Sequence, residues 1–112
     1  MTSGQSSELA TEVAVEAGTV VLTVRGELDM STVGGMVDQT TRQLAAGRDK
    51  LVLDFAEVTF CDSAGANGLI RLRNECDRAG CEFRLVGLQG HVRRVLVDLM
   101  GLGGLLNVPP AD

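Results

Sequence analysis

Residues 50–68 read KLVLDFAEVTFCDSAGANG, an apolar run that closes with an acid, a hydroxyl and two nearby glycines. Apolar side chains are nearly continuous over residues 50–55, which is typical of a strand covered on both faces. A helical pattern, LIRLRNECDRAG, follows at residues 69–80. The acid, the hydroxyl and the glycines therefore lie at a strand-to-helix junction, and a plain helix cap would need only one of them.

Strand patterns precede this junction. Residues 11–17 and 19–26 alternate apolar with polar or small side chains, which predicts two strands. Ala17 and Gly18 between them suit a hairpin turn, so the sheet is expected to open with an antiparallel pair.

Helix and strand patterns alternate through the rest of the chain. Helical spacing of apolar residues predicts helices within residues 30–47 and 89–101 as well, and residues 81–87 and 105–108 are expected to be strands. All three helices end just before a glycine, at Gly47, Gly80 and Gly101. The order predicts an α/β fold with a mixed central sheet of four to five strands and three main helices.

Composition limits the class of protein. The 112 residues suit one domain, which we place at residues 11–108 between a flexible tail at 1–10 and a short tail at 109–112. A net charge of −5 and only three aromatic residues, all Phe, argue against a nucleic-acid surface. The start lacks a signal-peptide pattern, and the apolar run at 99–108 is too short to cross a bilayer. We expect a soluble, cytoplasmic protein.

The cysteines are expected to be structural. Cys61, Cys76 and Cys81 are odd in number and lack CxxC spacing, which indicates reduced thiols. A zinc site would need a fourth ligand, and His91 is the single histidine. A redox role for Cys61 is the weaker alternative. Nothing in the sequence implies a bound metal or cofactor.

Ser63 stands where a helix N-cap belongs, and capping by its hydroxyl is the plain interpretation. Asp62 is itself a good cap and would leave that hydroxyl free. Gly65 and Gly68 are unfavourable in the first turns of a helix, so we interpret them as backbone left bare for another molecule. A phosphate on Ser63 would meet free N–H donors and the positive end of the helix dipole. A modifiable serine is chemically sensible here.

A second junction repeats the pattern. GELDMSTVGG at residues 26–35 precedes a helix, carries the acids Glu27 and Asp29, and closes with two glycines. Ser31 or Asp29 is expected to cap this helix, and the acids by themselves would also suit its dipole. If the two preceding strands are parallel neighbours, both junctions lie at one edge of the sheet, where α/β folds place their sites. We interpret that edge as a docking surface.

The sequence resembles the STAS domain and, within that family, the bacterial anti-sigma factor antagonists (anti-anti-sigma factors). The resemblance runs from Val13 to Val108 and rests on three motifs. These are GELD at 26–29, LVLDFAEVTFCDSAG at 51–65 and HVRRVLVDLMGL at 91–102. It implies the STAS fold.

The resemblance also implies a phosphorylation site, because the family phosphorylates the serine directly after the aspartate, here Ser63. Ala64 replaces a frequent Ser or Thr and leaves Ser63 without an adjacent alternative. Ala66 stands where an aliphatic residue is common, so a bulky apolar contact is missing. The partner-binding residues so predicted are Glu27, Asp29, Ser31, Asp62, Ser63, Ala64, Gly65, Ala66 and Asn67.

The implied mechanism is a partner switch. The unphosphorylated protein would bind an anti-sigma factor that is also a serine kinase using ATP, and a sigma factor would be freed. Phosphorylation of Ser63 would release the partner, and a phosphoserine phosphatase would reset the cycle. The protein itself would not be an enzyme.

Three alternatives compete with the switch. A receiver domain would use Asp54 as phosphoacceptor, but it needs a late lysine, and the one lysine is Lys50. A hydrolase would need an activated serine, but CDSAG is not the G-x-S-x-G motif and His91 reads as a surface or cap residue. The third is a STAS module that does not switch, such as a stress-signalling scaffold or a lipid-transport ATPase subunit.

Overall fold

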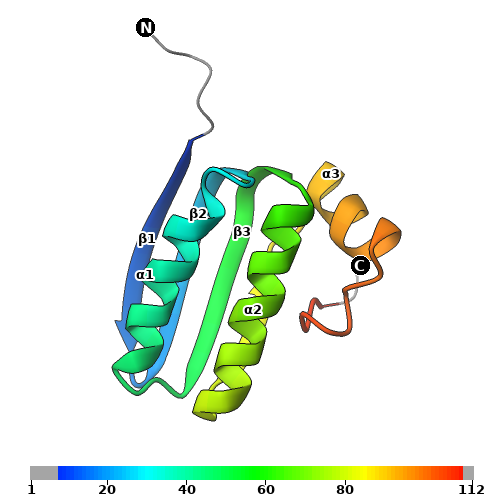
Figure 1. Cartoon of the computed structure of the whole chain (residues 1–112). Coiled ribbons are helices and arrows are strands. Elements are labelled where there is room, and N and C mark those ends of the chain that lie inside the picture. Colours follow the sequence, from blue (N-terminus) through cyan, green and yellow to red (C-terminus); the bar gives the residue numbers. More distant parts are fainter. Residues whose placement is uncertain (1–7, 110–112) are drawn as a thin grey trace, which may run out of the picture.

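The computed structural model describes residues 8–109 and shows one sheet with helices packed against it (Figure 1). The strands are β1 (Leu9–Glu16), β2 (Thr19–Leu28), β3 (Lys50–Cys61) and β4 (Glu82–Val86). The helices are α1 (Val33–Ala45), α2 (Ser63–Ala79) and α3 (Gly90–Arg93), which continues into the π-helix η1 (Arg94–Leu99). Within the described part of the chain, no helix is both long enough and apolar enough to cross a membrane.

The sheet has the order β1-β2-β3-β4. β1 pairs antiparallel with β2, whereas β2–β3 and β3–β4 are parallel. The hairpin turns at Ala17 and Gly18, which both have positive φ, at 51° and 83°. The predicted mixed sheet and its opening hairpin are confirmed.

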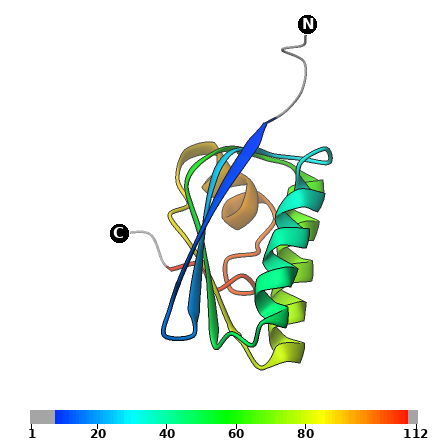
Figure 2. The same ribbon diagram turned by 90° about the vertical axis from the view of Figure 1, so that its left-hand side faces the viewer.

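One face of the sheet carries the core. α1 and α2 lie side by side on this face (Figures 1 and 2), and strand side chains pointing toward them are buried, as the alternation in residues 19–26 predicts. They include Val20, Leu22, Val24, Leu51, Leu53, Phe55, Phe83 and Leu85, each at most 4% exposed.

The other face of the sheet is open to solvent. On it Arg25 forms ion pairs with Glu12 at 3.1 Å and Glu57 at 3.2 Å. Val52 is half-buried there. The prediction that residues 50–55 are covered on both faces is therefore wrong. On its outer side this part of β3 carries Lys50, Val52 and Asp54, and the helices α1 and α2 that follow β2 and β3 both cross the opposite face.

The predicted helix ends are largely confirmed. α1 closes through Ala46 and Gly47, and α2 closes at Gly80, whose left-handed φ of 70° no other residue type adopts as easily. The third helix is shorter than residues 89–101, since it begins at Gly90 and its second half is a π-helix.

The predicted fifth strand at residues 105–108 is wrong, because this segment forms a turn. Asn107 has a φ of 52°, which interrupts an extended backbone, and its side-chain amide donates to the carbonyl of Phe83 in β4 at 2.8 Å. Leu106 is fully buried and anchors the turn in the core. The segment lies against the β4 edge of the sheet as an irregular cover.

The predicted domain limits need one change. Leu9 and Ala10 belong to β1, where Leu9 pairs with Gly26, so the folded part begins before residue 11. The remainder of the predicted N-terminal tail, residues 1–7, and residues 110–112 of the predicted C-terminal tail lie outside the described residues.

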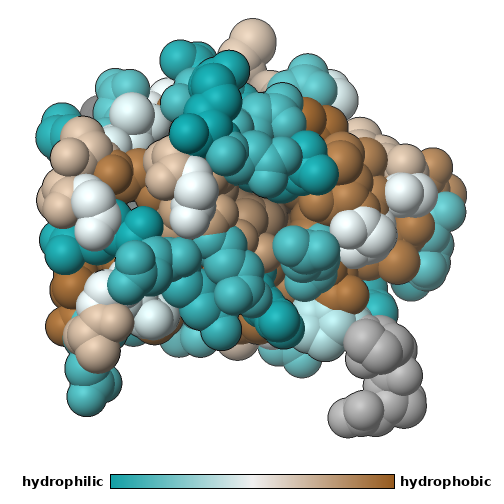
Figure 3. All heavy atoms as spheres, turned by 90° about the horizontal axis from the view of Figure 1, so that it is seen from below, coloured by the Kyte–Doolittle hydropathy of each residue, from teal (hydrophilic) through white to brown (hydrophobic). Residues whose placement is uncertain are grey.

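An apolar area is exposed on the C-terminal elements. Leu99 is 74% exposed, and Met100 and Leu105 are each 38% exposed. Figure 3 shows apolar side chains gathered at the side of the molecule that these elements occupy. This view is onto the hairpin end of the sheet, opposite the two strand-to-helix junctions of residues 26–35 and 60–68.

Candidate functional site

The two strand-to-helix junctions meet at one edge of the sheet. β2 and β3 are parallel neighbours, and their last residues, Leu28 and Cys61, are paired. The main-chain N–H of Asp62 donates to the carbonyl of Leu28 at 3.3 Å. The chain leaves both strands at the same end of the molecule and turns into α1 and α2 (Figure 1). The predicted common edge is confirmed.

Of the two residues predicted as possible caps of α2, Asp62 and Ser63, it is Asp62 that caps the helix. Its carboxylate accepts a hydrogen bond from the main-chain N–H of Gly65 at 3.0 Å, and its backbone is extended. Ser63 is the first residue of the helix and is exposed. Because Asp62 caps the helix, the hydroxyl of Ser63 lies at the helix N-terminus and is not needed for capping.

At the other junction the predicted caps have another role. Neither Asp29 nor Ser31 caps α1, whose N-cap is Thr32 without a side-chain cap bond. The carboxylate of Asp29 instead accepts from the N–H and the hydroxyl of Ser31, at 2.9 and 2.8 Å. Thr32 donates its hydroxyl proton to the carbonyl of Glu27 at 2.8 Å. These bonds hold the loop as a tight turn, with Glu27 and Ser31 exposed.

The glycines of α2 do not face a partner, which corrects the sequence-based interpretation. A Cβ on Gly65 would lie 2.8 Å from both the sulfur of Cys61 and the carbonyl oxygen of Leu28. A Cβ on Gly68 would lie 2.3 Å from a methyl of Val33 in α1. Both glycines are buried and let α2 approach β2 and α1 closely. The glycines of α1, Gly34 and Gly35, are exposed and have open space around them.

Ala66 is also removed from the predicted contact surface, because it is 3% exposed and belongs to the core. An aliphatic side chain at this position would point into the molecule, so its absence takes nothing from a docking surface. Ala64 is half-buried and Asn67 is exposed. Both line a shallow groove of about 240 Å³ between α1 and α2, which also includes Gly34.

Sequence reasoning missed the apolar residues at this edge. Met30, between Asp29 and Ser31, is 82% exposed. Phe60 is 39% exposed, and its ring stacks on that of His91 with centroids 6.1 Å apart and planes 17° apart. A signal was present for Met30, since it falls outside the apolar stripe of the following helix.

We define the candidate docking face, called the docking face below, by eight exposed or half-buried residues of the two junctions, leaving out Phe60, whose ring is stacked on His91. They are Glu27, Asp29, Met30, Ser31, Asp62, Ser63, Ala64 and Asn67. The face combines three carboxylates with one large apolar side chain.

The cysteines are buried and reduced. Burial, together with a smaller effect of the nearby charge of Asp62, raises the pKa of Cys61 to about 12. Burial likewise raises the pKa of Cys76 to about 12 and raises the pKa of Cys81. A thiol with such a pKa is scarcely ionised at neutral pH, and the redox alternative for Cys61 gains no support. Within residues 8–109, no cluster of three or more His, Cys, Asp or Glu side chains is arranged to hold a metal ion.

The geometry does not suit the receiver alternative. Asp54 lies in the middle of β3, where it is paired with Thr23, rather than at the strand end. Its carboxylate accepts from the N–H of Ala56 at 3.0 Å. The acids Glu27 and Asp29 lie further along β2 and beyond its end, so they do not gather around Asp54 as an acidic pair would.

The family follows from the comparisons with known proteins. Residues 10–110 match the STAS domain, which is nearly the whole chain. The chain belongs to the STAS domain family.

A curated relative and several solved structures are also similar to this chain. Osmosensory protein A of Mycobacterium tuberculosis is 33% identical over 66 residues, and the match covers 59% of this chain and 41% of that protein. An anti-sigma factor antagonist from Mycobacterium paratuberculosis has a similar structure, with a TM-score of 0.80, 26% identity and coverage of 93% of this chain and 87% of that one.

The fold is also that of SpoIIAA, an anti-sigma factor antagonist solved in its unphosphorylated form. That structure gives a TM-score of 0.76 at 23% identity and covers 92% of this chain and 89% of that one. The phosphorylated form of SpoIIAA, from Bacillus, has a TM-score of 0.69. At this level of identity the likeness concerns the fold.

Proposed function

We propose that this protein is an anti-sigma factor antagonist that works by partner switching. Unmodified, it binds an anti-sigma factor with serine kinase activity through the docking face and so frees a sigma factor. The kinase then transfers phosphate from ATP to Ser63, the partner dissociates, and a phosphoserine phosphatase restores the first state. The carrying observation is an exposed serine at a helix N-terminus whose capping role is filled by its neighbour Asp62.

The charges of the docking face support the release step. Phosphorylation adds about 1.5 to 2 negative charges at pH 7. The phosphate would stand next to Asp62, while Glu27 and Asp29 lie on the neighbouring junction of the same edge. Added charge on a surface that must lose water to dock is unfavourable by like-charge repulsion and by desolvation. A coupling of about 1 to 3 kcal/mol would change affinity by roughly 5- to 150-fold.

The helix N-terminus makes the modified state compatible with the fold. Ser63 is the first residue of a 17-residue helix, so a phosphate there meets the positive end of the helix dipole. Phosphorylation would therefore act on docking and leave the packing of α2 intact. The protein needs no catalytic group of its own for this role, because the kinase brings the ATP.

The test begins with protein recovered from its own cells, growing and stressed, followed by phosphopeptide mapping and identification of the bound partners. We expect phosphate on Ser63 that varies with conditions, and a kinase-like anti-sigma factor bound only to the unmodified form. With that kinase and ATP, Ser63→Ala should take up no phosphate and stay bound. Ser31→Ala, which removes the other exposed hydroxyl of the docking face, should still take up phosphate on Ser63.

The opposite result would favour the module that does not switch. No phosphate under any condition, together with stable scaffold or transport partners, would remove the switch. Equal partner binding and equal sigma release by Ser63→Ala and the wild type would do the same.

A further inference from the structure

The two edges of the sheet differ in how they are covered. At the β4 edge, the side chain of Asn107 donates to the carbonyl of Phe83, so the C-terminal segment lies against that strand. Among residues 8–109, nothing covers the β1 edge in this way. Figure 2 faces β1, and no other element of residues 8–109 lies between this strand and the viewer. An uncovered edge strand presents unpaired N–H and C=O groups to a further strand.

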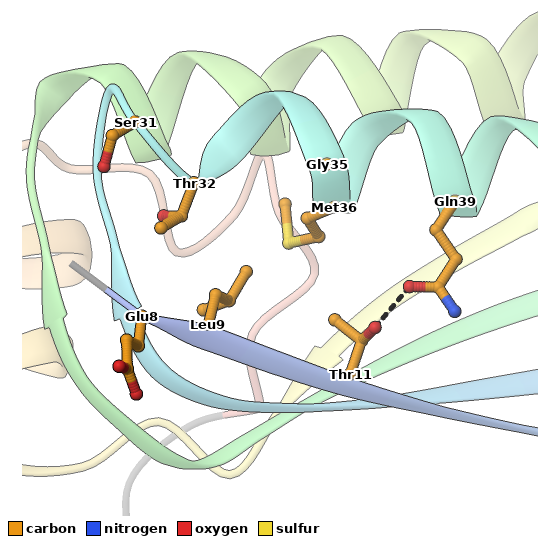
Figure 4. A pocket seen from close by; sticks show the side chains of 8 residues that line it. All are labelled: Glu8, Leu9, Thr11, Ser31, Thr32, Gly35, Met36 and Gln39. Carbon is orange, nitrogen blue, oxygen red and sulfur yellow. Dashed lines mark hydrogen bonds between the residues drawn. The ribbon is translucent and has the colours of Figure 1, made fainter. Parts of the chain in front are cut away.

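A pocket lies beside this open edge. It has a volume of about 560 Å³ and opens between β1 and the first turns of α1 (Figure 4). Leu9 and Thr11 line it from β1, and Met36 and Gln39 line it from α1. Thr11 is hydrogen-bonded to Gln39 at one end of the pocket.

The same strand carries an exposed apolar side chain at its other end. Val15 is 44% exposed. It is paired with the buried Val20, so it belongs to the helix-covered face, as Thr11 does through its pairing with Val24. β1 therefore offers a hollow near Thr11 and a projecting valine near its end, both on one side of the sheet. If β1 of a second copy paired antiparallel with this strand, Val15 of each copy would lie at the pocket beside Thr11 of the other copy.

The acids of β1 and the length of the paired stretch restrict the register of such a pair. Opposed residues of an antiparallel pair share a face, so a two-fold pair is centred on one residue. Centring on Glu12 would oppose the two copies of Glu12, and centring on Ala14 would oppose Glu12 with Glu16. Like charges directly opposite each other are destabilising. Centring on Val13 opposes Glu12 with Ala14, and keeps residues 10–16 paired.

We propose that β1 pairs with β1 of a second copy of this chain, antiparallel and centred on Val13, so that the two sheets join into one. In this arrangement Val15 of each copy lies opposite Thr11 of the other and fills the pocket beside it. The dimer uses β1 and α1 and leaves Ser63 exposed. The pocket shares Ser31 with the docking face, but the dimer does not require phosphorylation of Ser63.

Sedimentation equilibrium of the full chain, from about 10 µM to about 1 mM, tests the dimer and its register together. We expect a reversible dimer. Ala14→Glu places a carboxylate opposite Glu12 of the second copy, twice in the dimer, and should raise the dissociation constant on the order of tenfold. Ala14→Lys should lower it. Ala79→Glu and Ala79→Lys make the same charge changes on an exposed position of α2 and should leave it unchanged.

Cross-linking gives a second, geometric test. Opposed Cα atoms lie about 4.5 to 5.5 Å apart in an antiparallel pair, within reach of a disulfide. Val13→Cys should therefore form a disulfide dimer with oxidised glutathione. The two copies of residue 15 would be about 14 Å apart, so Val15→Cys should not form one. A chain that stays monomeric throughout, equal dissociation constants for the two Ala14 variants, or cross-linking at residue 15 in place of residue 13 would overturn the proposal.

Discussion

The main-chain N–H of Asp62 donates to the carbonyl of Leu28 at 3.3 Å, and this bond ties the end of β3 to the end of β2. Asp62 also caps α2, and Leu28 directly precedes the turn that carries Asp29 and Met30. The two halves of the docking face are thus joined through main-chain atoms. Ser63 directly follows Asp62, so a phosphate on Ser63 adds its charge next to the hydrogen bond that joins the two halves.

The cap at Asp62 should stabilise the protein measurably. Asp62→Ala leaves the N–H of Gly65 without its carboxylate acceptor and should lower the free energy of unfolding by about 1 kcal/mol. Asp62→Asn keeps an oxygen acceptor at the same distance along the side chain, so its free energy of unfolding should fall much less. Urea unfolding of both variants measures the difference. Equal losses would mean that the charge of Asp62, and not its capping bond, is what matters.

Two helical glycines should respond in opposite directions to alanine. Gly65→Ala forces a methyl to within 2.8 Å of the Leu28 carbonyl and should lower the free energy of unfolding by about 1 to 3 kcal/mol. Gly34→Ala places its methyl in open space and should raise that free energy by up to about 1 kcal/mol through helix propensity. Thermal unfolding compares the pair. Stabilisation by Gly65→Ala would contradict the close approach of α2 to β2.

Met30 should contribute to partner binding and little to folding. Because it is 82% exposed, Met30→Ala should leave the free energy of unfolding within about 0.5 kcal/mol of the wild type. Affinity for the co-purified anti-sigma partner, measured by calorimetry, should fall roughly tenfold, as for a central apolar contact. Leu99→Ala truncates another exposed side chain, remote from the docking face, and serves as control. Equal affinity for Met30→Ala and wild type would exclude Met30 from the interface.

The buried thiols should make the fold sensitive to alkaline pH. The folded-state pKa of Cys61 is raised from 9.0 to about 12, mainly by burial, so above pH 9 the unfolded chain loses a proton that the folded chain keeps. The stabilisation is complete below pH 9 and is lost as the pH rises toward 12. Over this range the free energy of unfolding falls by about 1 kcal/mol per pH unit for each such thiol.

Urea unfolding at pH 8, 9 and 10 measures this slope. Cys61→Ala should be less stable than the wild type at pH 8, because it leaves a small cavity, and should show a smaller further loss at pH 10. Parallel curves for the two proteins between pH 9 and 10 would mean that Cys61 is not held neutral by the fold.

Local patterns in the sequence were sufficient for most of the architecture. The alternation in residues 19–26 defines which side chains face the core, and the glycines after α1 and α2 mark where those helices end. Both depend on interactions within a few residues, which is why they can be predicted. Asp62 was predictable as a cap for the same reason, since its acceptor and donor are three residues apart.

The sequence by itself determined the order of the four strands and the main helices and the shared edge of the two junctions. Ser63 as the residue to modify stays a prediction. Only the tertiary structure decided which neighbours of Ser63 face solvent. Gly65 and Ala66 are turned inward because α2 packs on β2 and β3, and Met30 is turned outward because the Asp29 turn leaves it no core to enter. The open sheet face and the open β1 edge depend likewise on where distant segments pack, and no local pattern encodes contacts between segments so far apart in the chain.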